Sequence, residues 1–172
     1  MSSPFRRFVV TAAALALGLA ARGVAVADPA GGQPVDGVHC DAAEGSLFHI
    51  HQHVAIFDHG RAVTIPSDVG RPVVGQCLYW IHTHTADGII HIESPQVRGF
   101  SLGQLFDIWG QPLSPTHVAS GVVKKGQLRV FVGGRPYAGD PRAIGLTAHA
   151  DIVLEAGPPY RKPALFTGWG DL

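Results

Sequence analysis

The chain has 172 residues, of which 46% are hydrophobic, and its 13 basic residues balance its 13 acidic residues. This length allows one domain with a real hydrophobic core. The balanced charge, with no basic cluster larger than Lys124-Lys125, argues against a nucleic-acid-binding protein.

The first 27 residues are predicted to form a signal peptide. A basic start at Arg6 precedes an apolar stretch over 9–21 that is too short to span a bilayer comfortably. The small residues at 25–27 fit a cleavage site, so we expect the mature chain to begin at Asp28 and to keep no membrane span. Removing 27 of the 172 residues would leave 145. An uncleaved signal anchor is the alternative.

The residues after the predicted cleavage site, 28–45, are rich in glycine, proline and aspartate, and we expect them to form a flexible N-terminal arm. Cys40 and Cys77 are the two cysteines of the chain. Because an even pair in an exported protein usually forms a disulfide, we expect one here. Metal ligation by the thiolates is the alternative, although the cysteines lack the close C-x-x-C spacing of such sites.

A single histidine-rich domain is predicted over 46–157, and its first strand alternates strictly. The even positions from 50 to 56 make an apolar face, whereas the odd positions carry His49, His51 and His53. Since two residues advance a strand by about 6.5–7 Å, three such imidazoles do not easily share one ion. Two of them could complete a site begun elsewhere or bind a second ion, and an exposed face without metal is the alternative.

The strongest candidate site is a predicted hairpin after the second cysteine. The Asp-Gly pair at 87–88 predicts a two-residue type I′ turn. In that register His84 would face His91 and His82 would face Glu93, with about 4.5–5.5 Å between opposed Cβ atoms. Three imidazoles and a carboxylate suit a divalent transition metal such as Zn, Cu(II), Fe or Ni, which the pattern does not distinguish. A hydrogen-bonded polar ladder without an ion is the alternative.

One helix and two further strand regions follow. Ser101 with Gln104 predicts a capping box, and the helix should end at Gly110. Residues 111–126 are expected to form a loop. A strand over 128–132 turns at Gly133-Gly134, and a last strand over 150–155 precedes a tail over 158–172. His59-Gly60 predicts an earlier turn.

These elements predict an α+β domain of mostly antiparallel β-hairpins with one packed helix. A β-grasp-like arrangement is the first expectation, and a small barrel or sandwich is the second. About six short strands and a single helix support this class.

Three sequence motifs include residues outside the candidate site. W-I-H-T-H, D-G-I-I-H-I-E-S-P and F-S-L-G-Q-L-F-D-I-W-G begin at residues 80, 87 and 100 and cover a little under a fifth of the mature chain. They resemble motifs of an uncharacterised family of exported bacterial proteins, for which no activity is established. The resemblance therefore implies export and a common folded unit, but no reaction.

Three classes of function follow from the pattern. The first is an exported protein that captures, buffers or delivers a divalent transition metal, since the chain is small, rich in histidine and lacks the usual nucleophile motifs. The second is a small metalloenzyme whose three histidines and Glu93 leave a position open for hydrolytic or oxygen chemistry. The third is a structural or interaction domain that binds no metal. The sequence indicates no particular protein partner.

Overall fold

The computed structural model describes residues 32–73, 76–162 and 164–172. The predicted signal peptide therefore lies outside the described residues. The strands are β1 (Cys40–Asp41), β2 (Phe48–Asp58), β3 (Arg61–Val63), β4 (Leu78–Tyr79), β5 (Ile81–His82), β6 (Ile89–Ser94), β7 (Leu113–Ser114), β8 (His117–Val118), β9 (Gly121–Val122), β10 (Leu128–Val132), β11 (Arg135–Pro136) and β12 (Asp151–Ala156). The helices are α1 (Leu102–Trp109) and a short 3₁₀ helix, η1 (Pro141–Ala143).

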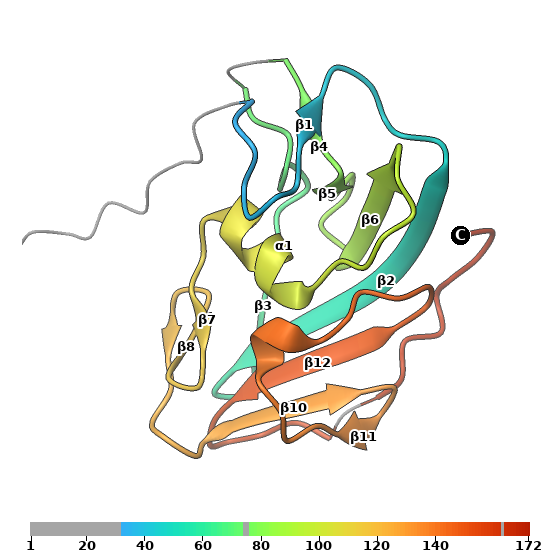
Figure 1. Ribbon diagram of the computed structural model, residues 1–172. Helices are drawn as coiled ribbons and strands as arrows, with labels where there is room; N and C mark the ends of the chain where they lie inside the picture. Colours follow the sequence, from blue (N-terminus) through green and yellow to red (C-terminus); the bar gives the residue numbers. More distant parts are fainter. Residues whose placement is uncertain (1–31, 74–75, 163) are drawn as a thin grey trace, which may run out of the picture.

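The main sheet has the strand order β11-β10-β12-β2-β6-β5, and β3 pairs with β2 (Figure 1). All neighbouring strands in it are antiparallel except β12 and β2, which are parallel. This arrangement confirms the predicted α+β class with mostly antiparallel hairpins and one packed helix. The parallel pair was not foreseen, because it joins strands from opposite ends of the domain.

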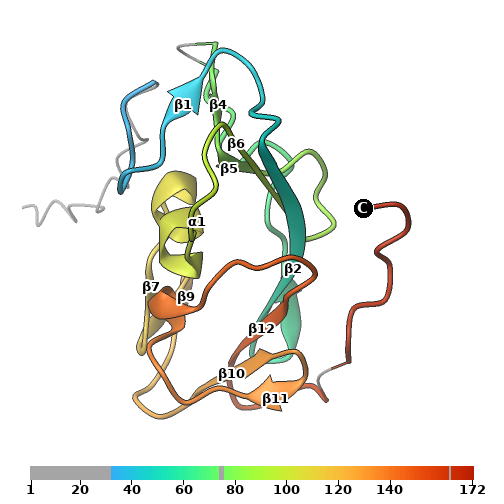
Figure 2. The same ribbon diagram turned by 45° about the vertical axis from the view of Figure 1, so that its right-hand side comes forward.

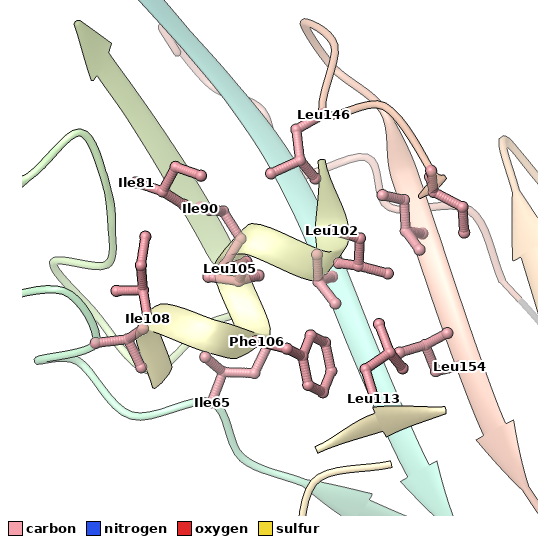
Figure 3. Packing of buried hydrophobic residues seen from close by; sticks show 14 of the residues in the cluster. Ile65, Ile81, Ile90, Leu102, Leu105, Phe106, Ile108, Leu113, Leu146 and Leu154 are labelled. Carbon is pink, nitrogen blue, oxygen red and sulfur yellow. The ribbon is translucent and has the colours of Figure 1, made fainter. Parts of the chain in front are cut away.

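Helix α1 begins and ends where the sequence predicts. The Ser101 side chain accepts a hydrogen bond from the backbone of Gln104, and the Gln104 side chain accepts one from the backbone of Ser101. Gly110 ends the helix in the left-handed conformation, with φ 68°. Leu102, Leu105 and Phe106 are fully buried against the main sheet (Figure 3). The capping box and the apolar stripe thus confirm the predicted helix.

The sheet has one face toward α1 and one face away from it. Val54 and Ile56 of β2, together with Ile92 of β6, are buried in the core. Ile90 of β6 lies beside Leu105 of α1 on the helix side (Figure 3). Side chains alternate along a strand, so the odd-numbered positions of β2 and β6 lie on the opposite face. The predicted separation of aliphatic and histidine faces is therefore confirmed.

The two predicted turns of the histidine strands have different outcomes. His59 and Gly60 both have positive φ, and the pairing of Ile56 with Val63 confirms the predicted turn. In contrast, β5 ends at His82, and six residues connect it to β6. The expected two-residue turn at 87–88 is therefore wrong.

Residues 111–126, expected to form a loop, contain a three-stranded antiparallel sheet of β7, β8 and β9. Its strands have two residues each, too few for hydrophobic alternation to be recognised in the sequence. Leu113 and Val118 attach this small sheet to the hydrophobic core.

The predicted disulfide between Cys40 and Cys77 is confirmed, with 5.4 Å between the Cα atoms. It lies beside the pairing of β1 with β4. Val38, within the segment expected to be a flexible arm, is fully buried in the core. The segment around β1 therefore packs against the rest of the fold.

The C-terminal tail lies on the sheet face opposite α1 (Figure 2). Buried carboxylates of Asp151 and Glu155 accept hydrogen bonds from the backbone of Phe166 and Arg161, respectively. The tail thus covers one face of β12 while the core covers the other, which explains why all six residues of β12 are buried.

Candidate metal centre

The candidate site occupies the sheet face away from α1, where β6 lies between β2 and β5. His91 of β6 pairs with His51 on one side and with His82 on the other. Glu93, two residues further along β6, pairs with His49. Directly paired residues project from the same face of a sheet, so cross-strand pairing gathers these side chains.

The register of β5 on β6 differs from the expected one by two residues. His82 pairs with His91, whereas the sequence predicted that His84 would do so. The cause is Thr83, whose backbone N–H donates to the Val69 carbonyl and whose hydroxyl donates to the Pro66 carbonyl. These bonds draw the chain away from β6 after His82. Because the shift is even, His82 and His91 still share a face.

The structure brings together the four strongest candidates. One ligand atom from each of His82, His84, His91 and Glu93 lies within 4.8 Å of the others. The Nε2 atoms of His82 and His84 are 3.1 Å apart. Two nitrogens on one tetrahedral zinc ion would lie about 3.3 Å apart, given Zn–N bonds of about 2.0–2.1 Å. This group could therefore hold a metal ion.

Hydrogen bonding orients the most buried histidine. His82 is 0% exposed, and its Nδ1 lies 2.9 Å from the Tyr79 carbonyl oxygen. A carbonyl oxygen only accepts, so Nδ1 must carry the hydrogen and a neutral ring then has its lone pair on Nε2. Nε2 is the atom that faces His84 and Glu93. A metal-binding histidine is commonly oriented by such a bond to its other nitrogen.

Burial keeps two of the histidines neutral. Together with the smaller effect of neighbouring histidines, it lowers the pKa of His82 to about 4 and the pKa of His91 to about 3. Burial also raises the pKa of Glu93, and so does the nearby charge of Glu44. At neutral pH a cation can bind these imidazoles without displacing a proton from them.

His91 has a buried polar atom that no hydrogen bond in the described part of the chain satisfies. That atom is Nδ1, and it lies 3.6 Å from Oε1 of Glu93. Leaving such an atom unpaired costs about 1–3 kcal/mol. Coordination of a metal would satisfy it.

The second-rank candidates separate into two sets. His49 and His51 form a second potential ligand group with His91, and their Nε2 atoms are 2.9 Å apart. His53 does not join them. Its Nδ1 lies 2.8 Å from Asp151 Oδ1, and its ring stacks on Phe166 with 4.0 Å between centroids.

Two further groups at the site were missed by sequence reasoning. Glu44 Oε1 lies 3.7 Å from Nε2 of His84, and the Tyr79 carbonyl orients His82. Glu44 belongs to a glycine- and aspartate-rich segment with no strand periodicity, so no signal in the sequence indicated its position. Trp80, two residues before His82, packs in the core and donates a hydrogen bond to Asp41.

Comparisons with protein-family models, with curated proteins and with solved structures found no significant match. The resemblance of the three motifs to exported bacterial proteins therefore stays a prediction.

Proposed function

We propose that this protein binds a divalent transition metal on His82, His84, His91 and Glu93, and that it captures, buffers or delivers that ion outside the cytoplasm. The observation that carries the proposal is the approach of four ligand atoms, all within 4.8 Å of one another, on one face of the sheet. Three imidazoles and one carboxylate suit Zn, Cu(II), Fe or Ni.

Export is the second part of the proposal. The disulfide fits an oxidising compartment, where such bonds form and persist. Among the described residues, no helix is both long and apolar enough to cross a bilayer. The signal peptide predicted over 1–27 would direct the chain to export.

One observation favours a small metalloenzyme as the second candidate. Oε1 of Glu93 lies 3.1 Å from Nε2 of His49, closer than it lies to His91 or His84. If Glu93 stays with His49, three histidines would hold the ion and leave a position open for water or substrate. Such an ion would acidify a bound water, and Glu93 would be placed to accept its proton.

Elemental analysis tests the metal site. The full chain is produced in an oxidising compartment without an affinity histidine tag, loaded with Zn(II) and washed. We expect about one ion or more per chain, and at least a ten-fold loss of affinity for the first ion when His84→Ala and His91→Ala are combined. Removing two of four ligands leaves too few donors for a stable site.

His117→Ala is the matched control, because His117 is an exposed histidine outside both ligand groups. Circular dichroism verifies that each variant is folded. The assignment would be refuted if the parent protein bound no metal. It would also be refuted if the control and the double variant lost the same affinity for the first ion. Loading with Co(II) separates the two candidate functions, since added azide changes the visible spectrum only when a coordination position is open.

A further inference from the structure

We infer that the histidine cluster is a two-ion centre, in which a second divalent ion binds His49 and His51 and shares Glu93 and His91 with the first. This inference rests on the proposed function, because the first ion occupies the site formed by His82, His84, His91 and Glu93. His49 and His51 lie on β2, His82 lies on β5 with His84 just after it, and His91 and Glu93 lie on β6, so the centre spans three neighbouring strands.

The side chains of His49 and His51 converge. Residues two apart on a strand have their Cα atoms about 6.5–7 Å apart. The two rings nevertheless tilt until their Nε2 atoms are 2.9 Å apart, with 4.6 Å between ring centroids. This separation is close to the spacing of two nitrogens that bind one ion, about 3.3 Å for zinc.

Nε2 of His49 has two polar neighbours within hydrogen-bond distance and can satisfy only one of them. Its Nε2 is 2.9 Å from Nε2 of His51 and 3.1 Å from Oε1 of Glu93. An imidazole nitrogen carries either one hydrogen or one lone pair. A single hydrogen can be directed at one of the two neighbours, whereas a cation among the three atoms would accept a lone pair from each.

Glu93 and His91 face the ligands of both ions. Oε1 of Glu93 lies beside His49, and Oε2 lies 4.0 Å from Nε2 of His82. The ring of His91 lies edge-on to His51 and His84, at centroid distances of 4.5 and 4.4 Å. A carboxylate has two oxygens, so Glu93 can serve two neighbouring ions. An imidazole can do so only as imidazolate, so binding of the second ion would release the remaining N–H proton of His91 to solvent.

Burial and charge determine the order in which the two ion sites are occupied. His82 is 0% exposed, whereas the side chain of His49 is 48% exposed. Imidazoles bring no negative charge, and Glu93 is the one buried carboxylate that the two groups share. Two dications would repel each other across it. We therefore expect the site of His82, His84, His91 and Glu93 to fill first, and the second ion to bind at least ten-fold more weakly.

A Cu(II) titration of the full chain tests the inference, because each Cu(II) ion carries one unpaired electron. Bound copper is counted after gel filtration, and electron paramagnetic resonance spectra are recorded at each addition. We expect two ions per chain at saturation. A half-field transition, which two unpaired electrons give only when they are close together, should grow with the second ion and be absent with the first.

Matched variants on one strand assign the second site. His49→Gln combined with His51→Gln should bind one ion and show no half-field transition. His53→Gln should still bind two, because His53 is held by Asp151 outside both groups. Circular dichroism verifies folding.

Each of the other outcomes overturns a stated part of the inference. One ion at saturation in the parent refutes the second site but leaves the proposed function standing, whereas no ion refutes both. Two bound ions that both keep the full signal of isolated Cu(II), without a half-field transition or a loss of intensity, refute the sharing of Glu93 and His91.

Discussion

His51 and His53 lie two residues apart on the same face of β2, yet their side chains have different partners. His51 turns toward His49 and His91, whereas His53 is held by Asp151 and covered by Phe166. Asp151 is 98 residues away in the sequence. At the scale of residues, the type of side chain is therefore a poor guide to its role unless its neighbours are known.

The neutral histidines predict how stability depends on pH. Their pKa values fall from the ordinary 6.5 to about 4 for His82 and about 3 for His91. Below pH 6.5 the unfolded chain then binds more protons than the folded one, so acid lowers the free energy of unfolding. We expect this stability to be complete above pH 6.5 and to decline toward pH 4 in the metal-free protein, as measured by urea denaturation. Glu93 acts in the opposite direction, because its pKa is raised.

His91→Gln is the comparison for this pH series, since it removes one of the two neutral histidines and keeps a polar side chain. The decline between pH 6.5 and 4 should be shallower in the variant. Equal slopes in the variant and the parent would mean that His91 titrates normally in the folded protein.

At the scale of elements, local signals succeed where the bonds that define an element are themselves local. The capping box of α1 joins residues three apart, and the sequence shows it directly. The turn between β5 and β6 depends on Val69 and Pro66, which hold Thr83 from a distant loop. Those bonds override the Asp-Gly signal, and Gly88 alone adopts positive φ at the predicted turn.

Loss of the helix cap should have a measurable cost. Ser101→Ala removes the side chain that accepts a hydrogen bond from Gln104, and such a change typically costs about 1 kcal/mol. Urea denaturation should show this decrease in the free energy of unfolding. Ser120→Ala, in an exposed turn, should change it far less. A loss of the same size in both variants would mean that the cap contributes nothing specific.

At the scale of the molecule, two long-range connections hold the histidine sheet together. The parallel pairing of β12 with β2 joins the end of the domain to its beginning, and the tail then covers the face of β12 that the core does not. The disulfide ties β1 to the segment before β4. The sheet that carries the site is thus held both by the pairing of β12 with β2 and by the disulfide.

Removal of the disulfide should destabilise the whole domain. It closes a loop with a sequence separation of 37 residues, and for that length the loss of loop entropy corresponds to about 4 kcal/mol. We expect Cys40→Ser combined with Cys77→Ser to lower the urea midpoint strongly, as followed by circular dichroism. An unchanged midpoint would show that the surrounding pairing alone holds β1 and β4.

The sequence by itself determined the features that depend on near neighbours. These are the α+β class, the capped helix, the turn at His59-Gly60, and a face that carries His82, His91 and Glu93. The disulfide joins residues that are far apart, but the sequence also predicted it, because the chain has two cysteines and they pair with each other. Alternation along a strand fixes which side chains share a face, and that rule survives the two-residue error in register because the error is even.

Only the tertiary structure decided which strands lie side by side. The pairing of β2 with β6 brings His49 and His51 to the site, and the tail removes His53 from it. Strand order and the approach of Glu44 result from contacts between segments far apart in the chain. No periodicity within one segment encodes those contacts, because they depend on the packing of the whole sheet.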